Sequence, residues 1–103
     1  MTEKIQIRAR ENNGIVSVKF VISHPMETGL RKHSKTGRLI SSHYIKEVMV
    51  SANDRTVMEA YWGPAIARNP YLSFNYAGAV GDSITVSWLD NKGRSASLTS
   101  RVK

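Results

Sequence analysis

The sequence of 103 residues has no cysteine, only three prolines, and only eight acidic side chains against fifteen lysines and arginines. Without cysteine, the chain cannot be a disulfide scaffold, a thiol enzyme, a thiolate zinc module or an iron–sulphur carrier. No apolar run approaches the roughly 20 residues that span a bilayer, so we expect no membrane partner. The first residues lead into a strand pattern instead of an apolar signal segment, so we expect no signal peptide. Taken alone, this favours a cytoplasmic location.

Positive charge is abundant and unevenly placed. The formal net charge is +7, and residues 30–38 contain Arg31, Lys32, Lys35 and Arg38 without any acid. Such a field attracts nucleic acid, an anionic membrane or an acidic protein. A solvated loop that keeps a small protein in solution has the same composition. Both interpretations stay open on charge alone.

Apolar residues recur with a period of two, which predicts strands instead of helices. The alternation is clear over residues 4–10 and again over residues 16–22. Between these segments, the pair Asn13-Gly14 supplies the positive φ angles that a type I′ turn requires. The first quarter of the chain is therefore predicted to be a β-hairpin.

Five further strands are predicted over residues 44–52, 56–62, 71–76, 83–89 and 94–102, and residues 24–38 are predicted to form a long loop. About seven short strands without a convincing helix indicate an all-β protein. We predict an immunoglobulin-like antiparallel β-sandwich that forms a single domain over residues 1–103. A small closed barrel is the competing architecture.

The predicted core takes the inward positions of both sheets. Its members are Ile5, Ile7, Val16, Val18, Phe20, Ile22, Val48, Val50, Phe74, Ile84, Val86, Trp88 and Leu98. Full burial of such a side chain contributes roughly 1.5–3 kcal/mol. The chain therefore has enough apolar residues to fold, and a permanent partner would add to its stability.

The sequence offers no recognisable catalytic or metal site. His24, His33 and His43 are nine and ten positions apart, so no two share a helix face or the i, i+2 spacing of a strand metal site. The acids show no pairing, no serine lies in a Gly-x-Ser-x-Gly motif, and no glycine run cradles phosphate. We therefore predict no catalytic residue, no cofactor and no metal.

A nucleic-acid interface is not expected either. The aromatic residues between positions 61 and 88 scatter over inward and outward positions, whereas a stacking platform needs them on one exposed face. Trp88 falls on the apolar face of its predicted strand. A small basic nucleic-acid-binding β domain is kept as the alternative function, on charge alone.

Several motifs occur in a specific order along the chain. Residues 22–32 read Ile-Ser-His-Pro-Met-Glu-Thr-Gly-Leu-Arg-Lys, and they are followed by Thr-Gly-Arg-Leu-Ile, by Asn-Pro-Tyr and by Trp-Leu-Asp-Asn-Lys-Gly. This arrangement resembles the SoxZ family, the non-catalytic subunits of the SoxYZ carriers in thiosulphate oxidation. The resemblance covers essentially the whole chain, and its His-x-Met-Glu segment is the most specific part.

The resemblance implies an immunoglobulin-like sandwich that forms a heterodimer with a SoxY-like protein. In such carriers, the partner holds sulphur intermediates on a cysteine in a C-terminal Gly-Gly-Cys-Gly-Gly tail, and other sulphur-oxidation enzymes dock transiently. It also implies a periplasmic location, because family members lack a signal and are exported with a partner that has one. An isolated chain with an uncovered interface could form a homodimer.

The predicted partner-binding residues lie in the first motif. They are His24, Met26, Glu27, Gly29, Arg31 and Lys32. Gly29 and Gly37 are predicted to adopt positive φ. Met26 offers a flexible apolar surface to a partner groove, or else fills a gap in the core. Arg31 and Lys32 are expected to meet carboxylates of the partner or of docking enzymes, and the positive surface could draw anionic sulphur substrates.

Overall fold

The computed structural model describes residues 4–103, and these form seven strands and no helix. No segment of this described part is a helix long and apolar enough to cross a membrane. The strands are β1 (Ile5–Asn12), β2 (Ile15–Ile22), β3 (Ile45–Ala52), β4 (Arg55–Tyr61), β5 (Tyr71–Ala77), β6 (Ser83–Asp90) and β7 (Ser95–Arg101). The predicted strands are therefore confirmed, with small shifts at their ends.

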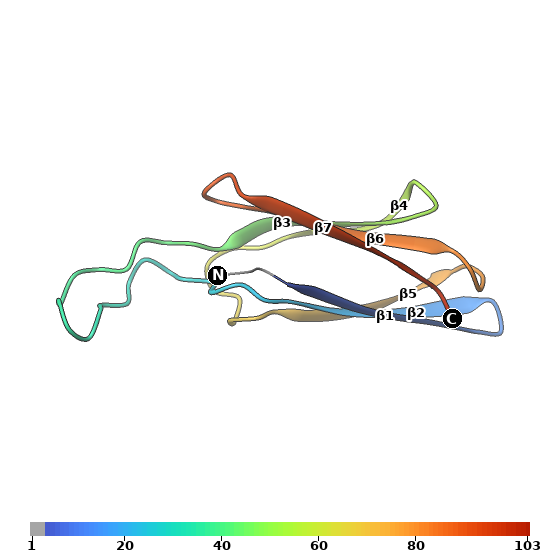
Figure 1. The fold of residues 1–103 in the computed structure, drawn as a ribbon, viewed down its shortest axis with the longest axis horizontal. Coiled ribbons are helices and arrows are strands. Elements are labelled where there is room, and N and C mark those ends of the chain that lie inside the picture. Colours follow the sequence, from blue (N-terminus) through green and yellow to red (C-terminus); the bar gives the residue numbers. More distant parts are fainter. Residues whose placement is uncertain (1–3) are drawn as a thin grey trace.

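The strands form two antiparallel sheets that face each other as layers (Figure 1). One sheet has the order β1-β2-β5 and the other the order β4-β3-β6-β7. This arrangement confirms the predicted sandwich, and the closed barrel was the wrong alternative. In the first hairpin Asn12 pairs with Ile15, and the two turn residues Asn13 and Gly14 have φ angles of 53° and 81°. The predicted type of turn is thus confirmed by its backbone.

The core lies between the sheets and contains most of the predicted residues. It consists of Ile5, Ala9, Val16, Val18, Phe20, Ile22, Met26, Ile45, Val48, Val50, Ala52, Ile84, Val86, Trp88 and Val102. Ile7 and Phe74 are only partly buried and pack against this cluster. The prediction for Leu98 was wrong, because this side chain remains 41% exposed. Leu98 lies on β7, an edge strand, where the packing of the opposite sheet covers it incompletely.

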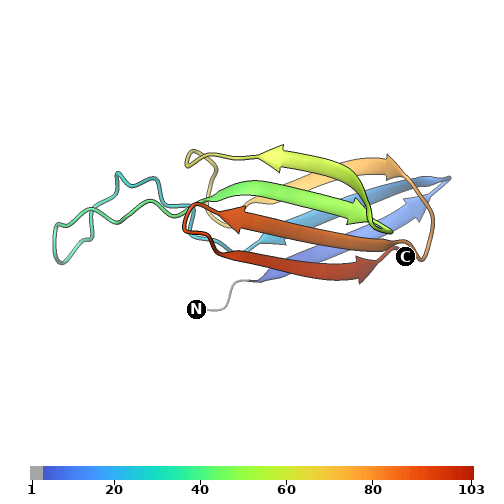
Figure 2. The same ribbon diagram turned by 90° about the horizontal axis from the view of Figure 1, so that it is seen from above.

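The segment between β2 and β3 projects from one end of the sandwich (Figures 1 and 2). It folds back on itself, with a bridge between Glu27 and His43 and a second bridge between Lys32 and Leu39. The predicted loop over residues 24–38 is therefore a paired ribbon that continues to the start of β3. We call residues 28–42 the arm. With the arm, the molecule measures 54 Å in its longest direction and 22 and 20 Å in the others.

Candidate functional site

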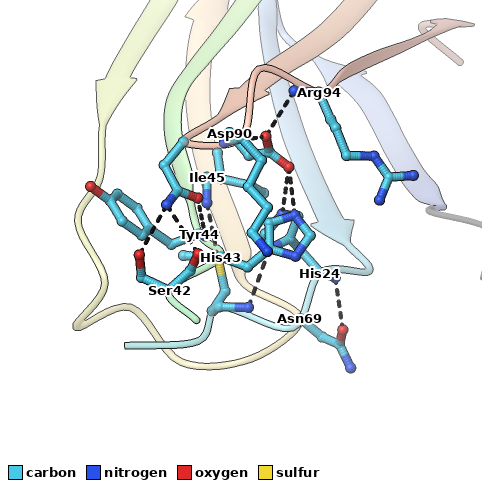
Figure 3. A network of polar contacts seen from close by, with 11 residues as sticks. His24, Ser42, His43, Tyr44, Ile45, Asn69, Asp90 and Arg94 are labelled. Carbon is cyan, nitrogen blue, oxygen red and sulfur yellow. Dashed lines mark hydrogen bonds and ion pairs between the residues drawn. The ribbon is translucent and has the colours of Figure 1, made fainter. Parts of the chain in front are cut away.

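The root of the arm is held by three segments that are far apart in the sequence. His24 follows β2, Asn69 precedes β5, and Asp90 ends β6 (Figure 3). Asn69 binds the backbone of His24 in both directions, since its N–H donates to the His24 carbonyl and its Oδ1 accepts the His24 N–H, each at 3.0 Å. The motifs on which the sequence resemblance rests thus converge at one place.

Asp90 is the centre of this root. Its side chain is fully buried, and Oδ2 accepts hydrogen bonds from Nε2 of His24 at 3.2 Å and from Nε2 of His43 at 2.7 Å. Its other oxygen, Oδ1, accepts the backbone N–H groups of Lys92 and Arg94 at 3.0 and 2.8 Å. The carboxylate therefore ties both ends of the arm to the β6–β7 turn. We call His24, His43 and Asp90 the latch.

Asp90 is charged at neutral pH in spite of its burial. Burial raises the pKa of this carboxyl, but the hydrogen bonds from Arg94, His43, His24 and Lys92 act in the opposite direction. Their combined effect holds the pKa below its ordinary value of 3.8. A buried charge that accepts four hydrogen bonds stabilises the fold only while every partner stays in place.

The hydrogen bonds of the latch also decide the proton position on His24. Its Nδ1 lies 3.2 Å from the backbone nitrogen of Met26, so Nδ1 accepts that N–H and carries no proton itself. The ring proton must then be on Nε2, the atom that donates to Asp90. His24 is therefore a neutral imidazole with a fixed tautomer, held edge-on against Trp88 at a ring distance of 5.2 Å.

The latch has donor atoms that suit a metal, because one atom from each residue lies within 4.8 Å of the others. A metal-bound imidazole, however, carries its proton on the non-coordinating nitrogen and donates it to an acceptor. In His24 the non-coordinating nitrogen would be Nδ1, which faces the Met26 N–H donor instead. The donor set thus fits a carboxylate bound by two imidazoles better than a metal centre.

Met26 fills the space between the root of the arm and the core. Its side chain is only 5% exposed and belongs to the core cluster, and its sulphur accepts the Ile45 N–H at 3.3 Å. Its φ angle of 50° is unusual for a residue with a side chain. The bond to His24 and the burial of the side chain together maintain this strained backbone. Burial agrees with the interpretation of Met26 as a core gap-filler.

The β6–β7 turn holds the returning strand of the arm. Asn91 donates from Nδ2 to the carbonyl of Ser42 at 3.1 Å and accepts the Tyr44 N–H at 2.8 Å. Lys92 reaches the hydroxyl of Ser41 at 3.0 Å. The Asp-Asn-Lys-Gly turn therefore connects two strands and also holds the arm through hydrogen bonds.

The outgoing strand of the arm is braced by an ion pair. Arg31 binds Glu27 with both Nε and Nη2, the first at 3.1 Å from Oε1. The hydrogen bond from Arg31 lowers the pKa of Glu27, so the pair is charged at neutral pH. Between the two members of the pair, Gly29 turns the chain with a φ angle of 89°, and Gly37 turns the tip of the arm with 70°, which confirms both predictions.

The surface of the arm combines apolar and positive side chains. Leu30 and Leu39 both lie in the arm, and they are 82% and 62% exposed. Arg31, Lys32 and the cations nearer the tip are exposed as well. Apolar side chains that are rimmed by polar and charged ones are typical of a surface that another protein covers.

The predicted partner-binding residues divide into two groups. His24 and Met26 are buried, so within this chain they position the arm instead of offering surface. Glu27 and Gly29 are half-buried at the root, and Arg31 and Lys32 are exposed. The partner contacts expected for these residues stay a prediction.

Sequence reasoning missed several residues of the root, above all His43, Asp90 and Asn91. The histidine spacing was considered only within one helix or strand, so it did not indicate that His24 and His43 come together with Asp90. His24 and His43 lie at the two ends of a folded-back ribbon, and their rings are 4.5 Å apart. The one available signal was the Trp-Leu-Asp-Asn-Lys-Gly segment, whose Asp-Asn pair is typical of a turn that accepts backbone hydrogen bonds.

The comparisons with known proteins agree with the motifs. A family model described as sulphur oxidation protein SoxZ matches residues 5–101, nearly the whole chain. No curated protein sequence matches the chain.

Among solved structures, the fold is similar to a chain described as a superoxide reductase (neelaredoxin) from Ignicoccus hospitalis. The TM-score is 0.67, and the match covers 99% of this chain and 78% of that chain at 14% sequence identity. At this identity the likeness shows a shared fold alone.

Proposed function

The chain belongs to the SoxZ family, so its role lies in sulphur oxidation, and on that premise we propose that it is the non-catalytic subunit of a heterodimeric sulphur-compound carrier. In this proposal the chain binds a SoxY-like subunit whose C-terminal cysteine carries the sulphur intermediates. It presents that subunit to the enzymes that load and unload it. The observation that carries the proposal is the arm, which is fastened at its root and offers uncovered leucines along its length.

The chemistry of a covalent sulphur carrier supports a second subunit. A sulphur intermediate bound to a protein through a disulfide-type bond needs a thiol, and these 103 residues contain no cysteine. The thiol must then be supplied by the bound subunit. The present chain contributes the scaffold and the recognition surfaces.

The marginal stability of the isolated arm is an argument for a stably bound partner. A two-stranded ribbon without a sheet beside it is marginally stable in water. Here the ribbon has few backbone bonds of its own, among them His33 N–H to Arg38 O at 2.8 Å and Ile40 N–H to Arg31 O at 2.8 Å. Covering Leu30 and Leu39 would add the burial that the isolated arm lacks. The acid-free surroundings favour carboxylates on the partner beside its apolar contact.

The proposal extends to location and assembly. We place the carrier in the periplasm, to which this chain would be exported together with its partner. When the chain is isolated, its leucines could meet those of a second copy and form a homodimer. Transient docking of sulphur-oxidation enzymes completes the proposed set of partners, which includes neither nucleic acid nor membrane.

The test is to purify the tagged chain from its native cells and to measure the intact masses of the proteins that co-elute. The proposal expects one companion in a one-to-one ratio that ends in Gly-Gly-Cys-Gly-Gly and carries extra mass on its cysteine. Recovery of nucleic acid without such a companion would overturn the proposal in favour of a basic nucleic-acid-binding domain.

Substitutions in the arm test its part in the complex. The double variant Leu30→Ser, Leu39→Ser is expected to lose the companion, because it removes the apolar contact and leaves the root intact. Val80→Ser is the matched control, since Val80 is 65% exposed and lies in the β5–β6 connection, away from the arm. Equal recovery of the companion by the arm variant and the control would exclude the arm as the interface.

A further inference from the structure

The outer face of the three-stranded sheet bears an unusual row of cations. In the register of β1, β2 and β5, Arg8 lies directly opposite Lys19, and Lys19 lies opposite Ser73. Arg10 follows two positions along β1, on the same face, beside Ser17. All three cations are exposed. Within the described residues, no ion pair involves any of them.

Like charges that lie directly opposite each other on adjacent strands destabilise a sheet. No outward position of the sheet compensates for this pair. The outward positions of the sheet are Gln6, Arg8, Arg10, Asn12, Ile15, Ser17, Lys19, Val21, Tyr71, Ser73, Asn75 and Ala77, and none of them is acidic. The face therefore carries an electrostatic cost that an anionic surface would remove.

The face also has a hollow and apolar groups. The paired cations line a shallow, open hollow of about 610 Å³, together with Gln6, Ile7, Phe20, Val21 and Tyr71. Tyr71 is 61% exposed. Arginine and tyrosine are among the side chains that are enriched where proteins bind one another.

We propose that this face, which we call the basic face, is a second docking surface, and that it binds a protein whose contact surface presents carboxylates around an apolar residue. The carboxylates would meet Arg8, Lys19 and Arg10, and the apolar residue would enter the hollow next to Tyr71. The proposal rests on register and charge, and it holds whichever subunit covers the arm.

The chemistry of the basic face differs from that of the arm in a way that suggests a different kind of complex. Exposed leucines favour a stable interface, whereas a largely polar and charged face favours a short-lived one with fast, salt-dependent association. A carrier needs both kinds of contact. The basic face would then attract each enzyme that visits the carrier, while the arm keeps the permanent partner.

The experiment uses two-dimensional amide NMR of the full chain with three probes. The first is a glutamate-rich peptide with a central leucine, the second is the same peptide with glutamine for every glutamate, and the third is an oligothymidylate of the same formal charge as the first. The proposal expects the acidic peptide to shift amides of β1 and β2 around Arg8 and Lys19. The glutamine peptide should leave them unchanged, and the oligonucleotide should bind more weakly there.

Two matched double variants test whether the cations of the basic face, and not positive charge in general, bind the acidic peptide. Arg8→Gln, Lys19→Gln is expected to weaken binding of the acidic peptide about tenfold, because it removes the facing pair. Lys46→Gln, Arg55→Gln removes the same charge from β3 and β4 of the other sheet and should weaken binding less than about twofold. Tighter binding of the oligonucleotide at the same face, a footprint confined to the arm, or equal effects of the two variants would each overturn the proposal.

Discussion

Replacing Asp90 by asparagine tests whether the latch holds the arm. The substitution preserves shape and one acceptor oxygen, which can still bind the N–H groups of Lys92 and Arg94. At the position of Oδ2, however, an amide group would face the Nε2–H groups of His24 and His43, which is a donor opposite two donors. His24 cannot relieve the conflict by changing tautomer, because Nδ1 must stay unprotonated to accept the Met26 N–H.

The expected cost follows from the bonds that are lost. The charged acceptor of two hydrogen bonds is removed, and each such bond contributes about 1.5–3 kcal/mol. We therefore expect Asp90→Asn to lower the free energy of unfolding by about 3 kcal/mol or more, a large part of the ordinary total of about 5–15 kcal/mol. With a urea dependence of about 1.5 kcal/mol per molar, the unfolding midpoint would fall by about 2 M.

Two assays check this expectation. Urea unfolding, followed by circular dichroism, gives the free energy at each pH. Because the folded pKa of Asp90 lies below its unfolded value, its contribution is present above that value and is lost as the pH falls through the folded pKa. The contribution of the Asp90 charge to the difference between wild type and variant should thus shrink as the pH falls below about 5.

Hydrogen exchange distinguishes a local effect of Asp90 on the root of the arm from a general loss of stability. The amides of Glu27 and His43 bond to each other's carbonyl across the root at 2.7 and 3.0 Å, so they should exchange faster in Asp90→Asn than strand amides do. Asp82→Asn is the control, because Asp82 accepts several bonds at the opposite end of β6. A loss below about 1 kcal/mol, or equal exchange at the root in both variants, would refute the latch.

Three further outcomes are expected. Lys19→Glu should raise the free energy of unfolding by about 0.5–1 kcal/mol in urea titrations, because an opposite charge then faces Arg8. Burial, and then the hydrogen bond to Asp82, raise the pKa of Tyr76 to about 12, so Tyr76 should ionise late in an ultraviolet titration, and stability should fall as the pH rises above about 10. Met26→Ala should cost about 2–4 kcal/mol, measured by urea unfolding, because it empties the buried space beneath the latch.

The sandwich could be predicted because its information is local. Each strand shows an alternation that one buried face imposes, and each tight turn carries the residues that its backbone requires. The second two-residue turn repeats the pattern, since Asn53 and Asp54 both have positive φ. Leu98 follows the same alternation, and the prediction of its burial was still wrong. Alternation predicts which side of a sheet a residue faces, but not how far the opposite sheet extends.

The latch could not be predicted in the same way. His24 and Asp90 are 66 positions apart, and His43 and Asp90 are 47 positions apart, so their contact depends on which strand ends meet at one end of the sandwich. No periodicity contains that information. The resemblance to a family indicated the right segments but not their contacts within the chain, where His24 and Met26 are buried.

The division between buried root and exposed arm gives the proposed complex a kinetic signature. A variant such as Asp90→Asn changes no contact with a partner, and it lowers affinity only by reducing the fraction of molecules whose arm is ordered. If that fraction falls to about a tenth, the affinity should fall about tenfold, mainly through slower association. Leu30→Ser removes a contact, so it should act mainly by faster dissociation. Surface plasmon resonance with the purified companion distinguishes the two, and faster dissociation in both variants would mean that Asp90 acts on the interface itself.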